Sequence, residues 1–417
     1  MKKTIALLLA CLLIVGMFAG CGPKTEDKAS VYYLNFKPEF NDALTKLAAK
    51  YTEKTGIEVK VVTAASGDYN KTLTSNIKDV TIFNIGNAAA LADWDEYALD
   101  LTDSAIAKEL TTNDFNLYNA AGELKAIGNC YESFGIIVNT KLLKDAGYTL
   151  ADITDFATLK AVAEDIHSRA AELGFDAFTT AGLHSDSSWR FSGHLATLPL
   201  HYEGVKGSVA TITGEHLDKF KNVWDLYINN SAADPATLSG DPTTSAEFKA
   251  GKAVFYQNGT WEYAGLIEAG MTDDQLAMIP IYCGAATDKN AALCSGTENC
   301  WAINAKASKA DQKASIDFLV WLVTDAEASK VYVEQLGAVP FKNCPASTNK
   351  FVADGNALLA AGKTSISWAF NYTPNVDSWR ATVVSALAAY SAGTAEWSKV
   401  VEAFVDGWAY EYNVVNG

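Results

Sequence analysis

The sequence predicts an α/β protein with two domains, for three reasons. Strand-like and helix-like segments alternate near the amino terminus, a pattern typical of a parallel sheet covered by helices. Helical periodicity dominates the last third of the chain. The length of 417 residues is long for one domain and sufficient for two. The composition, 49% hydrophobic and 20% charged, is that of an ordinary globular chain.

The amino terminus predicts an export signal. A basic start is followed by an apolar run, residues 5–18, which is shorter than the ~20 residues that span a bilayer. Two small residues then precede Cys21, an order that resembles the bacterial lipobox. We therefore expect residues 1–20 to be removed, Cys21 to be acylated at the outer face of the cell membrane, and residues 21–30 to form a tether. An uncleaved anchor and an ordinary secretory signal are the alternatives.

The next segments predict the first half of a sheet. The helix that starts at Pro38 ends at Gly56, because glycine adopts the left-handed conformation that closes helices. The pattern indicates strands at 31–36, 57–64 and 81–85 and helices at 38–55 and 72–78.

The remaining elements follow from the same periodicities. Residues 124–139 form one long strand-like segment. No internal repeat interrupts the pattern, which excludes solenoids and propellers. We expect helices at 156–173, 189–198, 216–228, 310–323, 326–336, 378–390 and 397–412, and strands at 253–257, 276–281 and 299–304.

Charge and cysteine usage exclude several classes of function. The net charge of −16 disfavours nucleic acid as a partner, because phosphate contacts need a basic surface. Five cysteines follow Cys21, and their odd number and spacing predict buried free thiols, although a bridge among Cys283, Cys294 and Cys300 stays open. The five histidines lack metal-ligand spacing, so we expect no metal and no cofactor. Nucleophile-elbow, Walker and dinucleotide motifs are absent.

Several short segments, in this order, resemble family 1 extracellular solute-binding proteins of ABC importers, the group of the maltose-binding protein. The resemblance covers essentially the whole chain after Cys21. The segments are GIEV at 56–59, ESFGIIVNTK at 132–141, KAVFYQNGTW at 252–261, ENCWAIN at 298–304 and the closing helix at 395–410.

The resemblance implies a two-lobe periplasmic-binding-protein type II fold, with a hinge of crossing strands and a ligand cleft between the lobes. Such proteins close on a ligand by hinge motion and present it to the permease subunits of an ABC transporter. We expect a monomer without enzymatic activity. Lobe one is expected at 31–131 with 303–350, and lobe two at 137–297 with 355–417.

Sugar recognition combines aromatic platforms for pyranose faces with carboxylate, amide and guanidinium groups at the hydroxyl edges. The resemblance maps Trp261 onto a stacking tryptophan and Glu132 onto an acidic residue at the cleft floor. Lys37 and Asn87 follow predicted strands at the carboxyl ends where α/β folds bind ligands. The further candidates are Trp189, Arg190, Asn258, Glu298, Trp368 and Trp379.

The function that these features predict is capture of an oligosaccharide of the maltose or raffinose kind for import. Two alternatives remain at this stage. One is a binding protein for a solute other than a sugar. The other is an extracellular glycoside hydrolase, which needs only two carboxylates flanking a glycosidic bond.

Overall fold

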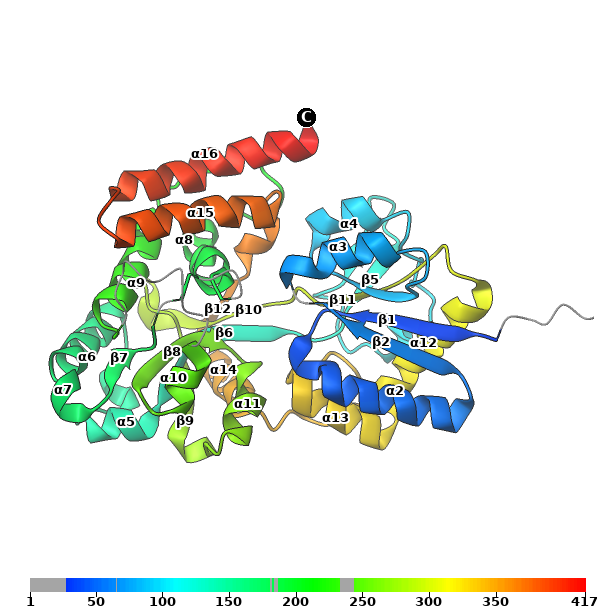
Figure 1. Cartoon of the computed structure of the whole chain (residues 1–417), viewed down its shortest axis with the longest axis horizontal. Coiled ribbons are helices and arrows are strands. Elements are labelled where there is room, and N and C mark those ends of the chain that lie inside the picture. The colour runs from blue at the N-terminus through cyan, green and yellow to red at the C-terminus, as the bar shows by residue number, and fades with distance from the viewer. Residues whose placement is uncertain (1–27, 65, 181, 184–186, 233–243) are drawn as a thin grey trace, which may run out of the picture.

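The computed structural model describes residues 28–64, 66–180, 182–183, 187–232 and 244–417. The expected signal segment and Cys21 lie outside the described residues. The described elements form two α/β lobes side by side, each built on its own sheet (Figure 1). No helix of the described part combines the length and the apolar character needed to cross a membrane.

Lobe one contains a six-stranded sheet of order β2-β1-β3-β11-β5-β4. Strand β1 is parallel to β2 and β3, as the alternating pattern predicts, whereas β11 runs antiparallel to β3 and β5. The strands are β1 (Ser30–Asn35), β2 (Glu58–Thr63), β3 (Ile82–Ile85), β4 (Leu117–Tyr118), β5 (Leu124–Gly128) and β11 (Cys300–Ile303). The helices are η1 (Pro38–Phe40), α2 (Asn41–Thr55), α3 (Ser66–Asn76), α4 (Ala88–Trp94), η2 (Ala107–Glu109), α12 (Lys309–Thr324) and α13 (Ala326–Leu336).

Lobe two contains a sheet of order β12-β10-β6-β8-β7, with β9 paired to β6. The strands are β6 (Glu132–Asn139), β7 (Asp176–Phe178), β8 (Ala253–Gly259), β9 (Leu276–Ile279), β10 (Ala291–Gly296) and β12 (Thr364–Ser367). The helices are α5 (Thr140–Asp145), η3 (Leu150–Asp152), α6 (Phe156–Ser168), α7 (Ala170–Leu173), η4 (Arg190–Leu195), α8 (Thr197–Tyr202), α9 (Leu217–Asn229), α10 (Thr244–Lys249), α11 (Glu262–Glu268), η6 (Asp273–Gln275), η7 (Asp288–Asn290), α14 (Lys350–Ala360), η8 (Ala369–Tyr372), α15 (Val376–Ser391) and α16 (Trp397–Asn416).

Local sequence signals fix several helix ends. Gly56 closes α2 with φ of 73°, and its N–H donates to the Thr52 carbonyl, which confirms the predicted helix end. Asp155 caps α6 by accepting from the N–H of Thr158. The last two helices, α15 and α16, pack on each other at the outer side of lobe two (Figure 1).

The expected single strand at 124–139 is wrong, because the chain forms β5 in one sheet and β6 in the other. Between them, the Asn129 N–H donates to the Asn299 carbonyl and the Tyr131 N–H to the Ala338 carbonyl. These two bonds take the place of the hydrogen-bond ladder that a continuous strand would form with a neighbouring strand. They also tie together the three segments, 129–131, 297–299 and 337–349, through which the chain passes between the lobes.

Two expected helices also differ from the structure. The helix at 156–173 is broken at Arg169, whose guanidinium donates to the Asp165 carboxylate and the Ala146 carbonyl. The helix at 189–198 is a π-helix, η4, followed by α8. Periodicity alone also missed the strands β7, β10 and β12 and the helix α14. Strands β7 and β10 are short and largely buried, and such strands lack an alternating pattern.

The five cysteines that follow Cys21 are free thiols, and four of them are buried. All five lie within the described residues, and their free state agrees with the prediction that they form no disulfide framework. Among the tryptophans, Trp224, Trp301 and Trp408 are fully buried core residues. The two lobes therefore have large aromatic cores of their own.

Gly135 in β6 gives a test of the lobe-two sheet. A Cβ at this position would lie 2.4 Å from the Ile279 carbonyl oxygen and 2.9 Å from Leu293 Cδ2. We expect Gly135→Ala to lower the free energy of unfolding by about 2–3 kcal/mol, since overpacked backbone must shift. Gly207→Ala is the control, because no atom lies within 4 Å of its Cβ position. Equal urea midpoints for the two variants would contradict this packing.

Candidate functional site

A cavity of about 850 Å³ opens between the lobes, and residues from both lobes and from the crossing segments line it. Lobe one contributes mainly the turn after β1, whereas lobe two contributes most of the aromatic wall. The crossing segment 297–299 contributes Glu298 and Asn299, and Glu132 comes from the start of β6, directly after segment 129–131. Domain boundaries are where ligand sites preferentially occur, and this volume is that of a typical small-molecule site.

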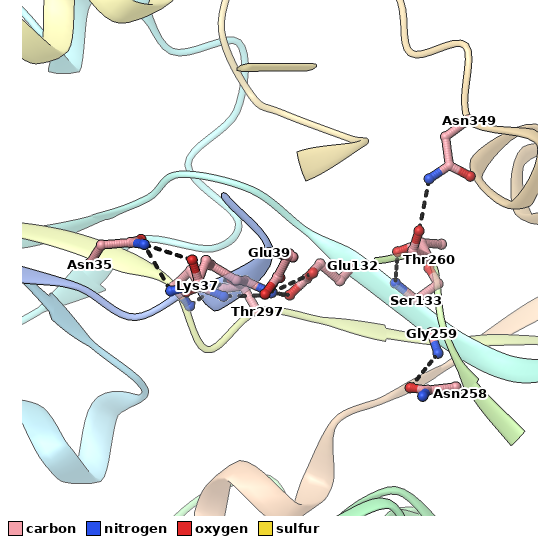
Figure 2. A network of polar contacts seen from close by, with 11 residues as sticks. Asn35, Lys37, Glu39, Glu132, Ser133, Asn258, Gly259, Thr260, Thr297 and Asn349 are labelled. Carbon is pink, nitrogen blue, oxygen red and sulfur yellow. Dashed lines mark hydrogen bonds and ion pairs between the residues drawn. The ribbon is translucent and has the colours of Figure 1, made fainter. Parts of the chain in front are cut away.

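The turn after β1 carries the first polar group of the cavity. Asn35 ends β1, its amide donates to the Lys37 carbonyl at 2.6 Å, and its oxygen accepts from the Lys37 N–H at 3.1 Å. Pro38 then starts η1, because its fixed φ suits the first helical position. The side chain of Lys37 is thereby directed toward the start of β6 (Figure 2).

Lys37 and Glu132 form an ion pair across the cavity floor. The Lys37 ammonium donates to both oxygens of Glu132, at 2.6 and 2.7 Å, and lies 3.3 Å from Glu39 (Figure 2). The side chains are only 12% and 4% exposed, so both charges are largely removed from water. Asn299 adds an amide donor to Glu132 at 3.4 Å.

The two partners respond differently to burial: it raises the pKa of Glu132 against the opposing effect of the Lys37 charge, whereas the pKa of Lys37 is set by its carboxylate neighbours. Burial by itself lowers the pKa of Lys37, but the carboxylates of Glu132 and Glu39 outweigh it and raise the pKa above its ordinary value. Burial raises the pKa of Glu298, while the charges of Arg380 and Lys37 lower it. The cavity floor therefore holds two buried carboxyl groups, Glu132 and Glu298, whose pKa values are both raised by burial and lowered by the nearby cations.

Two tryptophans of the wall lie against glycines at strand ends. A Cβ on Gly259, the last residue of β8, would come within 2.2 Å of the Trp261 ring. A Cβ on Gly296, the last residue of β10, would come within 2.6 Å of the Trp368 ring. Both glycines are therefore needed for close approach, and they fix the indoles where the sheet edge meets the cavity.

Trp261 is central to the aromatic wall. Its ring lies 6.0 Å from Trp189, 5.6 Å from His194 and 6.5 Å from Trp368, between centroids. The Lys37 ammonium lies 5.5 Å from the Trp261 centroid, a cation–π contact that links the lobes. Trp261 remains partly exposed, so part of its ring surface is available to a ligand.

Six of the residues singled out from the sequence lie together at the cavity. They are Lys37, Glu132, Trp189, Trp261, Glu298 and Trp368.

Four others lie elsewhere and make internal contacts. Asn87 accepts from the Ala90 N–H as the cap of α4. Arg190 is 2% exposed and donates to the Gln257 carbonyl, and Asn258 donates to Tyr256 and Glu262. Trp379 is fully buried and donates to the Phe404 carbonyl between α15 and α16. These residues position the wall or the core.

The sequence patterns missed several lining residues. Glu39 follows Lys37 by two positions, Phe370 follows Trp368 by two, and Arg380 is the neighbour of Trp379. For these three residues, closeness in sequence to a predicted site residue was the signal that could have identified them. His194 could not have been found in this way, because it reaches the cavity through a π-helix, which the sequence pattern did not predict.

Removing one partner of the floor pair tests its contribution. Lys37→Met leaves Glu132 buried and unpaired, and we expect a loss of about 3 kcal/mol in unfolding free energy, measured by urea denaturation. The double variant Lys37→Met with Glu132→Leu should recover much of this loss. Lys50→Met is the control, since its exposed pair with Glu327 should contribute less than ~1 kcal/mol. Additive losses in the double variant would exclude a coupled pair.

The comparisons with known proteins agree with this geometry. A family model described as bacterial extracellular solute-binding protein matches residues 46–360. No curated protein matches the sequence. Among solved structures, RafE in complex with raffinose has a TM-score of 0.71 at 15% identity, over 93% of this chain and 100% of that one.

Two further structures are similar. A chitin oligosaccharide binding protein has a TM-score of 0.72 at 17% identity, over 94% and 100% of the two chains. The GacH receptor of Streptomyces glaucescens has a TM-score of 0.67 at 18% identity, over 93% and 99%. At these identities the structures establish the two-lobe fold alone. The family model spans well over half of the sequence, and the chain therefore belongs to the bacterial extracellular solute-binding proteins.

Proposed function

We propose that this protein captures a neutral oligosaccharide between its lobes, closes on it and delivers it to the permease of an ABC importer. One observation carries the proposal: Trp189, Trp261 and Trp368 share one cavity with buried carboxylates. Indole rings match the weakly apolar faces of pyranoses, and carboxylates accept from their hydroxyls. The ligands named for RafE, the chitin oligosaccharide binder and GacH, the last with acarbose, support a sugar of several rings.

The charges of the wall favour an uncharged sugar. Among the residues that line the cavity, carboxylate side chains outnumber cationic ones. The ammonium of Lys37 already forms ion pairs with Glu132 and Glu39. A uronate or phosphorylated sugar would place negative charge beside these carboxylates, and the repulsion between like charges costs free energy. The carboxylates are those of Glu39, Asp68, Glu132, Glu262, Glu268 and Glu298, and the cations are Lys37, Lys249 and Arg380.

Export and anchoring complete the proposal. The family is extracellular, which agrees with the export signal expected at 1–20. Acylation of Cys21 would hold the protein at the outer leaflet near the importer, because each buried acyl methylene contributes about 0.8 kcal/mol. A sugar binder held there meets its ligand outside and its permease in the same membrane.

A defined sugar panel tests the binding activity. The panel contains maltose, maltotriose, raffinose, chitotriose and, as an anionic counterpart, trigalacturonate. We expect one of the neutral sugars to raise the melting temperature without being cleaved, since a ligand at a hundred times its Kd stabilises by about 2.7 kcal/mol. Trigalacturonate should give no shift. Hydrolysis of a sugar would identify an enzyme instead, and a panel without any shift would refute sugar capture.

The stacking residue gives a second test. We expect Trp261→Ala to weaken binding of the panel's best sugar at least tenfold by calorimetry, because the ligand loses its aromatic platform. Trp94→Ala is the matched control, since Trp94 packs against Phe83 and Tyr97 in lobe one, away from the cavity lining. Equal affinities of the two variants would remove Trp261 from the site.

The anchor has its own test. In a bacterial host that acylates lipoproteins, we expect Cys21→Ala to move the protein from the membrane fraction to the soluble extracytoplasmic fraction. Cys344→Ala, which changes a half-buried thiol of the folded part, should stay with the membrane. Membrane retention of the Cys21 variant would show that acylation is not what holds the protein.

A further inference from the structure

One part of the cavity wall has an unusual backbone, the π-helix η4 (Arg190–Leu195). All six of its residues are buried, and Trp189 immediately precedes it. A π-helical turn takes more residues than an α-helical one, and such turns occur frequently at functional sites. Here the turn places His194 in the cavity lining and sets Gly193 against Arg380, whose nearest nitrogen would lie 3.0 Å from a Cβ.

The His194 ring is held in one orientation by its neighbours. It stacks on Phe134 with centroids 3.8 Å apart and an interplanar angle of 7°. Trp189 meets it edge-on at 4.9 Å, and Trp261 is tilted against it at 5.6 Å. The residue is only 4% exposed, and it lies in the same wall as the two tryptophans that would contact a sugar.

The protonation of His194 follows from its surroundings. The Gln257 amide nitrogen lies 2.8 Å from Nδ1, and in this orientation of the amide it donates, Nδ1 accepts and the ring carries its proton on Nε2. The same orientation leaves the Gln257 amide oxygen buried without a partner among the described residues. Burial, then the guanidinium groups of Arg190 and Arg380, hold the pKa of His194 well below its ordinary value. Glu262 and Glu298 line the same cavity but make no ion pair with the ring.

This leaves a hydrogen-bond donor without a partner. Within the described part of the chain, Gln257 is the partner of Nδ1, and Nε2–H donates to no side chain or carbonyl. His194 Nε2 is not among the fully buried polar atoms that lack a partner, so it faces the open volume of the cavity, where a ligand can reach it. A ligand oxygen in the cavity would supply the missing acceptor.

We propose that His194 is a ligand-binding residue whose Nε2–H donates to a hydroxyl oxygen of the sugar held against Trp189 and Trp261. The inference rests on the proposed sugar capture and names a contact within it. The imidazole acts as a neutral donor of fixed direction, because Gln257 occupies its other nitrogen. Protonation of His194 should therefore change binding little between pH 5 and 8, since burial, and then the charges of Arg190 and Arg380, disfavour the protonated ring.

A pair of variants from neighbouring helices tests the contact. His194→Phe keeps a flat ring on Phe134 but removes the donor, and we expect at least a tenfold loss of affinity, about 1.4 kcal/mol, for the panel's best sugar. His201→Phe is the control, because His201 lies in α8 near Ser367 and outside the cavity lining. Circular dichroism and melting temperature verify that each variant folds. Equal affinity of His194→Phe and the unaltered protein would overturn the inference while leaving sugar capture intact.

Nitrogen NMR of the unaltered protein, labelled in histidine, tests the same contact without a substitution. We expect His194 to keep its proton on Nε2 from pH 5 to 8 and that Nε2–H resonance to shift when the sugar saturates the protein. A proton on Nδ1, a titration near the ordinary histidine pKa, or an unmoved resonance at saturation would each overturn the inference. If none of the panel sugars bound, sugar capture itself would fail, and this contact with it.

Discussion

The buried ion pair between Lys37 and Glu132 is the interaction on which the site depends. Glu132 starts β6 at the point where the chain enters lobe two, and Lys37 follows β1 of lobe one. A carboxylate buried there without a partner would be costly, so the pair specifies how the turn after β1 meets the crossing segments. The same ammonium lies over Trp261, which couples the polar floor to the aromatic wall.

The hydrogen bonds among the crossing segments allow this pair to join two separate lobes. Asn129 donates to the Asn299 carbonyl, and Tyr131 donates to the Ala338 carbonyl, so three distant parts of the chain meet beside the cavity. The crossings lie outside helices and strands, and hinges are built from such connecting residues because these can absorb backbone rotation. A ligand that contacts both Lys37 and Trp261 would stabilise the closed arrangement through its differential affinity for it.

The aromatic wall depends on backbone features more than on aromatic composition. Gly259 and Gly296 let Trp261 and Trp368 approach the ends of β8 and β10, and a π-helix brings His194 between Trp189 and Trp261. An ordinary α-helical turn would change the direction of every side chain after Arg190. These side chains therefore share one surface because of local backbone geometry that residue types alone do not reveal.

Sequence and tertiary structure determined different parts of this protein. The α/β class, the helix end at Gly56 and the free thiols followed from the sequence, because periodicity, capping and cysteine spacing are local properties. Lys37 was singled out by its place after a predicted strand, and Glu132 and Trp261 by the family resemblance, and all three line the cavity. The split of 124–139 into β5 and β6, the burial of Trp379 and the entry of His194 and Arg380 into the cavity were decided only by the fold. Their physical reason is the same: each depends on contacts between segments far apart in the chain, and periodicity along the chain carries no information about such contacts.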